Sequence, residues 1–390
     1  MNNFTYDIPT RIHFGKDALD FIGEEVGKYS KKLLLTYGGG SIKKNGIYDK
    51  VVEELNNKNI EIFELSGIKP NPRIDSVREG VKLIKENDIG VILAVGGGST
   101  IDASKIMAAG AKVEFDPWDF ISEGKEIKDA IPLFTVLTMA ATGSEMNGGA
   151  VISNPETNEK LAAGSYYTRP KASFLNPELT YTVSEFQTAA GSADIMSHLF
   201  EIYFNNNDSM YMLDRMMESL MKTVIEYGPK AIKDPKNYEA RANLMWASSW
   251  AINGFLSASS NAEWSNHPME HELSAFYDIT HGLGLAILTP RWLDYVLSDD
   301  TVNKFYDLGV NVFNIEQSED KMEVARKTIE KVSEFFFEKL GLDNNLNALG
   351  IDEENFDAMS KKACGKNGVI KGFIDLNPED VRKIYEMSLN

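Results

Sequence analysis

The sequence predicts an α/β domain built on a parallel sheet, followed by an all-helical domain. Up to about Tyr181, short β-rich runs alternate with amphipathic stretches, whereas long segments of helical periodicity follow and strand-like alternation nearly disappears. Such alternation is typical of parallel β-α units with helices on both sheet faces. At 390 residues the chain is also too long for one typical core. We therefore expect domains at residues 1–182 and 183–390.

The elements of the first domain are expected from their individual runs of residues. Asn-Pro-Glu-Thr-Asn divides two short β-like runs and predicts a hairpin over 150–164. His13 lies in an N-terminal strand and is interpreted as structural. The other strands are expected at 31–37, 59–65, 88–95 and 131–138, with helices over 47–58 and 76–87.

Three long segments with helical periodicity open the second domain, at 184–204, 209–228 and 237–257. Methionines gather in the second of them, and flexible thioethers pack well between helices. We interpret them as core residues: Met210, Met212, Met216, Met217 and Met221.

Composition excludes several classes of partner. The 58 acidic and 40 basic residues give a net charge of −18, which opposes binding to nucleic acid or to anionic membranes. The single cysteine, Cys364, excludes an intramolecular disulfide and fits a reducing compartment. There is neither a signal-peptide pattern nor a long uncharged apolar run. We expect a cytoplasmic protein acting on a small molecule.

Four of the five histidines lie between residues 198 and 281. Asp194 and His198 are four apart on an expected helix, which places them on one face about 6 Å apart along its axis. His267 and His271 repeat this spacing, and His281 follows. A single such pair is often only a local ion pair. Together they predict a divalent-metal site of Asp194, His198, His281 and either His267 or His271.

Two polar turns follow predicted strands. Gly96, Gly97, Gly98, Ser99 and Thr100 lead into a helix, where free N–H groups suit a pyrophosphate. The turn is neither a P-loop nor a G-x-G-x-x-G motif, because Ile101 replaces the last glycine. The second turn offers hydroxyls for a phosphate or ribose, from Thr138, Thr142 and Ser144 around Gly143.

A third turn, Gly38–Ser41, follows the strand after which dinucleotide-binding folds often carry a carboxylate for the ribose 2′-OH. No carboxylate stands here, and Lys43 and Lys44 are nearby. A 2′-phosphate could be accommodated, so the turn favours NADP(H) over NAD(H). The alternative is that the two lysines belong to a solvated helix face.

Taken together, these motifs resemble the iron-containing (group III) alcohol dehydrogenases, and within them the NADPH-dependent butanol dehydrogenase and aldehyde reductase branch. The resemblance covers essentially the whole chain, through RIHFG, KPNPR, GGGSTIDASK, TMAATGSEMN, the D-x-x-x-H pair and HPMEHELSAFYDITHGLGLAILTP. It implies a Rossmann-like nucleotide domain, an all-helical metal domain in a dehydroquinate synthase-like architecture, an active site between them and a homodimer.

The resemblance also assigns residues. His271 would be a non-ligand near the nicotinamide, able to relay protons. Many NAD-dependent members carry Asp near position 39, whereas this chain has Gly39, as the NADPH-preferring branch does. The implied metal ligands are Asp194, His198, His267 and His281. The implied cofactor residues are Gly38, Gly39, Ser41, Asn71, Gly96, Gly97, Gly98, Ser99, Asp102, Thr138, Thr142, Ser144 and Lys160.

The expected reaction is hydride transfer between NADP(H) and a primary alcohol or aldehyde bound to a divalent ion, Fe²⁺ or Zn²⁺, with Co²⁺ and Ni²⁺ also compatible. One alternative is a zinc metallopeptidase, because His267, Glu270 and His271 spell H-x-x-E-H. A polyol-phosphate dehydrogenase on the same fold would need basic residues for the substrate phosphate. A noncatalytic nucleotide sensor is the third alternative.

Overall fold

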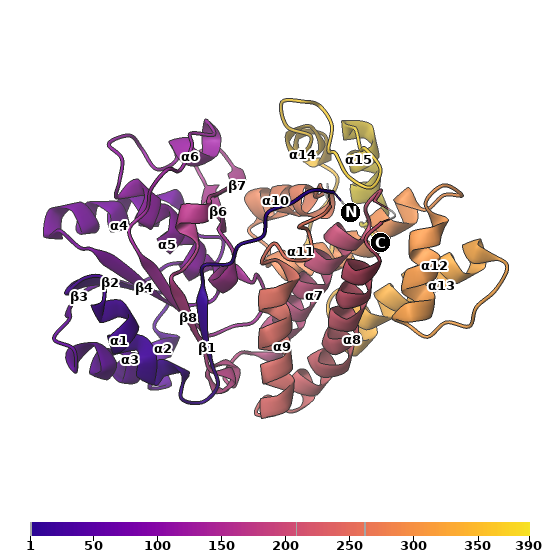
Figure 1. Ribbon diagram of the computed structural model, residues 1–390. Helices are drawn as coiled ribbons and strands as arrows, with labels where there is room; N and C mark the ends of the chain where they lie inside the picture. The colour runs from indigo at the N-terminus through magenta and orange to yellow at the C-terminus, as the bar shows by residue number, and fades with distance from the viewer. Residues whose placement is uncertain (1, 208, 261–262) are drawn as a thin grey trace. The chain divides into compact units, whose positions relative to one another are not determined.

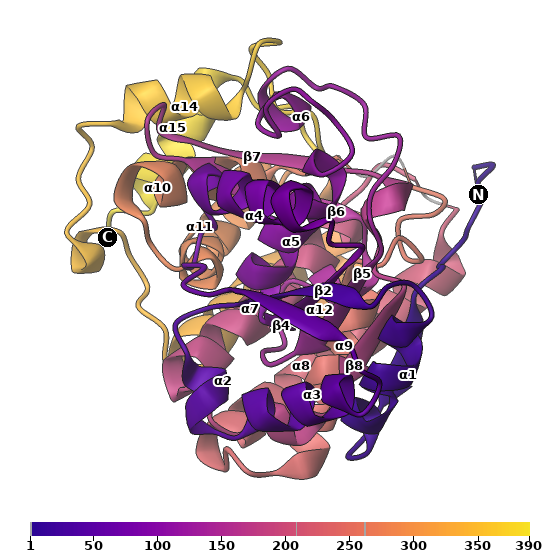
Figure 2. The same ribbon diagram turned by 90° about the vertical axis from the view of Figure 1, so that its left-hand side faces the viewer.

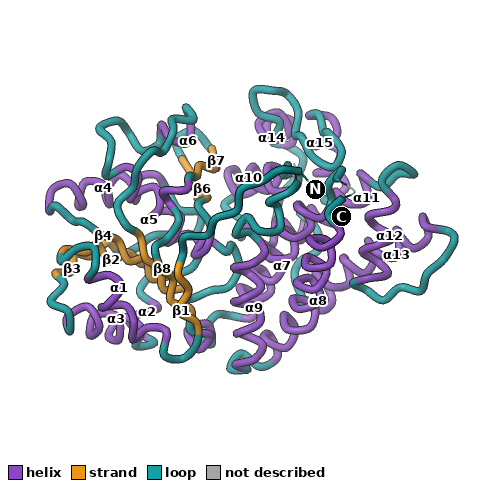
Figure 3. Tube along the Cα trace, viewed as in Figure 1, coloured by secondary structure: helices purple, strands orange, loops and turns teal. Residues whose placement is uncertain are grey.

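The computed structural model describes residues 2–207, 209–260 and 263–390, which form two units. The α/β unit comprises Asp7–Val183 and Lys236–Asn253, and the helical unit comprises Met1–Tyr6, Ser184–Pro235 and Gly254–Asn390. Within the described residues, every named strand belongs to the α/β unit (Figure 3). The domain limits at 182 and 183 stay a prediction.

A six-stranded sheet organises the α/β unit, and all its paired strands are parallel, as predicted. The strand that the sequence analysis did not predict, β8, has only four residues, too few to show a pattern. In sheet order the strands are β1 (Arg11–Phe14), β8 (Ala172–Leu175), β5 (Leu133–Leu137), β4 (Val91–Gly96), β2 (Lys32–Tyr37) and β3 (Glu61–Leu65).

Helices cover both faces of this sheet (Figures 1 and 2). Leu33 and Leu35 point into one core with α1 (Ile22–Gly27) and α3 (Ile47–Asn56). Leu34, between them in sequence, points into the opposite core with α4 (Ile74–Asn87) and α5 (Gly98–Gly110). Because both faces are buried, the strands read as continuous apolar runs. The shorter helices are η1 (Ala18–Phe21), α2 (Ser41–Lys44) and α6 (Asp119–Ser122).

The carboxyl ends of β2, β4 and β5 lie at one edge of the sheet. Tyr37 pairs with Val95, and Gly96 pairs with Leu137, so the three strands end nearly level. From β2 the chain continues to β3 on one side, whereas from β4 it continues to β5 on the other. Ligands of open α/β sheets bind at such a switch point. The fold therefore brings the three polar turns predicted from the sequence to one edge.

Outside the main sheet, β6 (Gly149–Asn154) and β7 (Glu159–Gly164) form an antiparallel pair, which confirms the predicted hairpin. Helix α9 (Tyr238–Ala251) packs within the α/β unit, where Ser249 Oγ donates to Glu145 Oε1 at 2.5 Å. It ends earlier than the predicted 237–257 segment, before Gly254 adopts a φ of 95°. The remaining short turns are η2 (Ser144–Met146), η3 (Tyr166–Thr168) and η4 (Pro177–Thr180).

Helix α7 (Glu185–Tyr203) is the central element of the helical unit, and it is buried from Thr188 to Tyr203. It packs against α8 (Tyr211–Lys233) and α11 (His281–Val296). None of the described helices is long and apolar enough to cross a membrane. The other elements are α10 (Asn266–Tyr277), α12 (Val302–Asn311), α13 (Lys321–Ser333), the π-helical turn η5 (Glu334–Lys339), η6 (Asn347–Leu349), α14 (Phe356–Ala363) and α15 (Pro378–Met387).

The interpretation of the α8 methionines is wrong for two of the five. Met210, Met217 and Met221 are buried, but Met212 is 53% exposed and Met216 is 37% exposed. The two exposed residues are four apart, which places them together on the outward face of the helix.

Candidate active site

Helix α7 supplies three polar side chains along one face. Asp194, His198 and Glu201 are spaced by four and three residues, so they follow one another by successive turns. The Ser184 hydroxyl accepts a hydrogen bond from the amide of Gln187 and caps the helix start. All three polar side chains are almost fully buried, which is costly for such groups unless they are paired.

Helix α11 approaches α7 closely because Gly282 has no side chain. A Cβ atom at Gly282 would lie 2.0 Å from the backbone oxygen of Ala190, nearer than any real contact. This contact places His281, the first residue of α11, one turn away from Asp194 along α7. Small residues at the crossing therefore determine where the imidazole lies.

Helix α10 is attached to α7 through Glu201. The carboxylate accepts hydrogen bonds from the backbone amides of Ser265, Asn266 and His267, at 2.8, 2.7 and 2.8 Å. These groups form the start of α10, where unsatisfied N–H groups and the positive end of the helix dipole favour an anion. Asn266 also donates to Thr289 of α11 at 2.7 Å. The start of α10, and with it His267, is thereby fixed in position.

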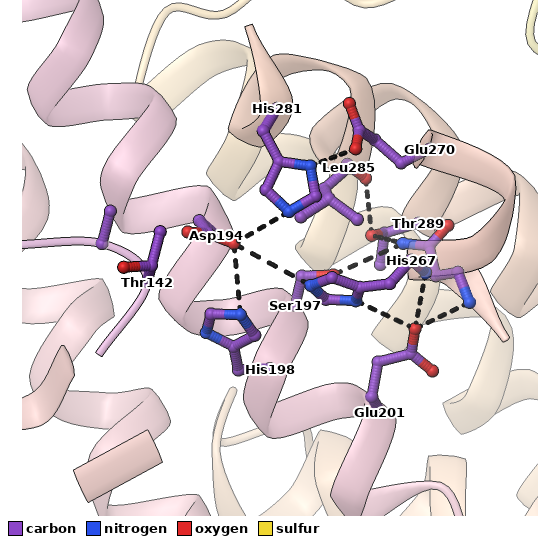
Figure 4. A network of polar contacts seen from close by, with 12 residues as sticks. Thr142, Asp194, Ser197, His198, Glu201, His267, Glu270, His281, Leu285 and Thr289 are labelled. Atoms are coloured by element: carbon purple, nitrogen blue, oxygen red, sulfur yellow. Dashed lines mark hydrogen bonds and ion pairs between the residues drawn. The ribbon is translucent and has the colours of Figure 1, made fainter. Parts of the chain in front are cut away.

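The four predicted ligands come together around one carboxylate oxygen. The Nε2 atoms of His198, His267 and His281 lie 3.4, 3.9 and 3.7 Å from Asp194 Oδ1. Figure 4 shows the three rings converging on Asp194 from α7, α10 and α11. The side chains of Asp194, His198 and His267 are at most 7% exposed, and that of His281 is 23% exposed.

Two of the imidazoles are oriented by carboxylates behind them. His267 Nδ1 lies 3.1 Å from Glu201 Oε1, and His281 Nδ1 contacts Glu270 Oε2. A carboxylate that binds Nδ1 leaves Nε2 free to coordinate a metal. Metal-binding histidines usually have such a hydrogen-bond partner on the ring nitrogen that does not bind the metal. Burial, together with the charges of the neighbouring histidines, lowers the pKa of His198 well below its usual value. A neutral imidazole is the form that binds metals.

Asp194, His267 and His281 fit a divalent ion, because their ligand atoms all lie within 4.8 Å of one another, and His198 Nε2 lies 3.4 Å from Asp194 Oδ1. Ligand atoms about 2.0–2.2 Å from a tetrahedral centre stand about 3.3–3.6 Å apart, close to the distances measured from Asp194 Oδ1. His267 Nε2 is buried and forms no hydrogen bond within the described part of the chain. Nitrogen and oxygen donors of this kind suit zinc, iron, cobalt and nickel.

His271 lies beside this cluster, and its ring is partly exposed. The His271 ring centroid is 5.7 Å from that of His281 and 6.3 Å from that of His267. Glu270 is fully buried, where it contacts His281 Nδ1 and accepts from Ser274 Oγ. A metallopeptidase would need this glutamate as a base toward a solvent-derived nucleophile. In this structure Glu270 instead orients His281 through its contact with Nδ1.

The predicted cofactor residues lie in the α/β unit, most of them in the turns that follow β2, β4 and β5 at the carboxyl edge of its sheet, whereas Asp102 lies within α5 and Lys160 in β7. Helix α5 begins at Gly98 without a side-chain cap, so its first amides face the edge where β4 ends. Thr142 packs against Gly98, which has no room for a Cβ atom at that point. The 38–41 turn follows β2, and Asn71 precedes α4 with a positive φ of 48°.

The fold of the chain does not require glycine at position 39. Its φ does not lie in the left-handed region, and a Cβ atom built there would meet nothing within 4 Å. Any L-residue could therefore occupy the position as far as the fold is concerned. A glycine in such an open place is what a closely approaching ligand requires.

Both halves of the chain match one protein family. Residues 9–177 match the family described as iron-containing alcohol dehydrogenase, and residues 188–389 match its C-terminal domain. The chain belongs to the iron-containing alcohol dehydrogenase family. It is thus an oxidoreductase of the alcohol dehydrogenase and aldehyde reductase type, and the resemblance inferred from the sequence is confirmed.

Three relatives illustrate this membership. An NADH-dependent butanol dehydrogenase B of Clostridium acetobutylicum is 50% identical over 390 residues, with 100% of both chains covered. An NADPH-dependent aldehyde reductase of Escherichia coli is 39% identical, with 99% of each chain covered. The crystal structure of NADH-dependent butanol dehydrogenase A from Thermotoga maritima has a TM-score of 0.95 at 38% identity, covering 100% of this chain and 99% of that one.

The structure of this alcohol dehydrogenase adds buried groups that the sequence analysis missed. Lys105, the last residue of GGGSTIDASK, donates to Ser144 Oγ at 2.8 Å and to the Gly149 oxygen at 2.6 Å. Ser144 donates in turn to Asp102, which also accepts from the Val151 amide at 3.0 Å. Burial lowers the pKa of Lys105 to about 8 and raises the pKa of Asp102. The network joins α5, η2 and the hairpin.

The carboxylates behind the histidines were missed as well. Glu201 follows His198 by three residues, and Glu270 is part of H-x-x-E-H. This spacing beside the histidines was the one sequence signal that could have identified the two carboxylates as histidine partners. The partners of both lie on other helices, which no local pattern reveals. Lys160 of β7 is also buried, near enough to Asp102 to influence its pKa.

Proposed function

We propose that this alcohol dehydrogenase interconverts primary alcohols and aldehydes, of which butanol and butanal are representative, with NADP(H) as its preferred cofactor. A divalent ion would be held by Asp194, His198, His267 and His281. The observation that carries the proposal is the convergence of three imidazole Nε2 atoms on Asp194 Oδ1. The predicted α/β domain would hold the nicotinamide cofactor and the helical domain the metal.

The site supplies the parts that this chemistry needs. When bound, a divalent ion offers a Lewis acid for the alcohol or carbonyl oxygen, and a nicotinamide gives or accepts the hydride. Asp194 brings one negative charge to the cluster, while Glu201 and Glu270 hold His267 and His281 in the coordinating orientation. These buried carboxylates keep those two imidazoles from turning away.

His271 would handle the proton. It is next to the cluster, with its ring centroid 5.7 Å from that of His281, and it is partly exposed. An alcohol must lose a proton when it is oxidised, and an aldehyde must gain one when it is reduced. An imidazole that is not used as a ligand can both accept and donate a proton.

The cofactor would lie along the carboxyl edge of the sheet. The open start of α5 would receive the pyrophosphate at Gly96, Gly97, Gly98 and Ser99. The hydroxyls of Thr138, Thr142 and Ser144, in the turn after β5, would contact the nicotinamide half of the cofactor. Asp102 and Lys160 would contact the same half. The adenosine half would lie against Gly38, Gly39, Ser41 and Asn71.

The preference for NADP(H) is supported by the open position of Gly39 and by the absence of a carboxylate in the 38–41 turn. A carboxylate there would repel a 2′-phosphate. Relatives of both kinds exist, since one is named NADH-dependent at 50% identity and another NADPH-dependent at 39%. We further propose a cytoplasmic homodimer containing iron or zinc.

The test combines metal analysis with a cofactor assay on the purified protein. We expect about one divalent ion per chain and butanal-dependent oxidation of NADPH that is faster than that of NADH at equal concentration. Removal of the ion with a chelator should abolish turnover, and readdition should restore it. Reduction of butanal by metal-free protein would overturn the proposed site. Light scattering of the same preparation gives the oligomeric state.

A further inference from the structure

A second group of charged side chains lies beside the 38–41 turn, in the α/β unit. Lys43 of α2 reaches back toward the end of β2, where its Nζ is 5.1 Å from the ring centroid of Tyr37 and 4.3 Å from that of Tyr48. Tyr37 immediately precedes Gly38. The ammonium group is thus held at the turn, although Lys43 and Lys44 are both exposed, as the alternative considered from the sequence expects.

Glu64 of β3 neutralises that ammonium group. Lys43 Nζ lies 3.3 Å from Glu64 Oε2, and the same carboxylate accepts from Tyr37 Oη at 2.5 Å and from Tyr48 Oη. Burial acts to raise the pKa of Glu64, but the hydrogen bonds from Tyr37, Tyr48 and Lys43 outweigh it and lower the pKa. Glu64 is therefore a fixed negative charge on the strand next to β2.

We infer that Glu64 is a specificity-determining residue that limits the preference for NADPH, because it occupies the cation that would otherwise pair with a 2′-phosphate. The inference rests on the proposed function, which places the adenosine ribose at this turn. Nothing in the turn itself opposes a phosphate, since it contains no carboxylate and Gly39 is open. The opposing charge comes instead from the neighbouring strand.

The two charges act in opposite directions on the 2′-phosphate of NADPH, and neither acts on the 2′-hydroxyl of NADH. A 2′-phosphate is attracted by Lys43 and repelled by Glu64, whereas the 2′-hydroxyl of NADH carries no charge for either to act on. The side chains of Lys43 and Glu64 are 48% and 36% exposed. For half-exposed pairs of this kind, we expect an effect on selectivity of about 2- to 5-fold.

The test compares Glu64→Gln with Glu61→Gln. Glu61 is an exposed residue of the same strand and makes no ion pair with the described residues, so it controls for the loss of one negative charge. Dissociation constants of NADPH and NADH are measured by nicotinamide fluorescence, and kcat/KM is measured with butanal. Glu64→Gln should raise the NADPH-to-NADH ratio by about 2- to 5-fold in both measurements. Glu61→Gln should leave both ratios as they are.

Lys43→Met and Lys44→Met form the second comparison. Lys43→Met should lower the ratio and should remove the effect of Glu64→Gln in the double variant. Lys44→Met should change little, because Lys44 is exposed and forms no ion pair with the described residues. An unchanged ratio in folded Glu64→Gln would overturn the inference while leaving the proposed function intact. Failure to bind either cofactor, or to reduce butanal, would overturn the proposed function itself.

Discussion

The interaction between Glu201 and the start of α10 predicts that one buried carboxylate controls both metal affinity and stability. Glu201 is 1% exposed and accepts hydrogen bonds from the three amides that begin α10. We consider Glu201→Gln, which preserves size and shape. Glutamine keeps one acceptor oxygen for the amides of Asn266 and His267. Its NH₂ group then faces the N–H of Ser265, which also donates.

The magnitude follows from these contacts. Loss of one hydrogen bond to a charged group costs about 1.5–3 kcal/mol, and the Ser265 amide is left buried without an acceptor. We expect the metal-free protein to lose about 2–4 kcal/mol of stability on this basis. His267 also loses the negative charge behind Nδ1, and loss of such an outer partner lowers metal affinity about 10- to 100-fold.

Two measurements separate these effects. Chemical denaturation of metal-free protein gives the free energy of unfolding, and competition with a chelator of known affinity gives the metal dissociation constant. Glu226→Gln is the matched control, since Glu226 is an exposed residue of α8 whose ion pair with Lys230 lies at the surface. It should change stability by less than about 0.5 kcal/mol. If folded Glu201→Gln bound the ion as tightly as the parent, the assigned role of Glu201 would be wrong.

Four further predictions follow from the same structure. His267→Ala should lose the ion, whereas His271→Ala should retain it in elemental analysis and slow turnover about 100-fold or more; metal loss from His271→Ala would reverse the two roles. Gly39→Asp should lower the ratio of NADPH to NADH affinity at least about tenfold through repulsion of the 2′-phosphate, and an unchanged ratio would exclude the 38–41 turn from the cofactor site. Gly282→Ala should destabilise the protein by about 1–3 kcal/mol and weaken metal binding, because the new methyl group meets the α7 backbone; unchanged unfolding and metal affinity would contradict the close approach of α11. The pKa of Lys105 falls to about 8 in the folded protein. Between pH 8 and pH 10.5 the Lys105 side chain is therefore more protonated in the unfolded chain than in the folded protein. The contribution of Lys105 to the free energy of unfolding should rise by about 3 kcal/mol over this range. Denaturation of Lys105→Met should lack this rise, and an identical pH dependence in the variant would refute it.

Much of the fold could be predicted because its signals are local. Strands β2, β4 and β5 lie close to their predicted positions, since each is a run of apolar β-formers, and the β6–β7 hairpin does so because its Asn-Pro-Glu-Thr-Asn turn is a local signal. The four-residue β8 and the exposure of Met212 and Met216 were not predicted. Which face of α8 packs inward depends on neighbouring helices, and residue type alone does not specify it.

The sequence by itself determined which residues could bind a metal or a dinucleotide, because residue type and spacing along one element are properties of the chain. It left either His267 or His271 open as the fourth member of the cluster until the family resemblance chose between them. Only the tertiary structure brought the Nε2 of His267 to 3.9 Å from Asp194, through the Glu201 contact, and the Nε2 of His281 to 3.7 Å, through the approach of Gly282 to α7. It alone revealed Glu64 beside Lys43 and Lys105 beneath Ser144. These pairs join elements far apart in the chain, and their distances depend on how helices and strands pack, which no spacing within one element encodes.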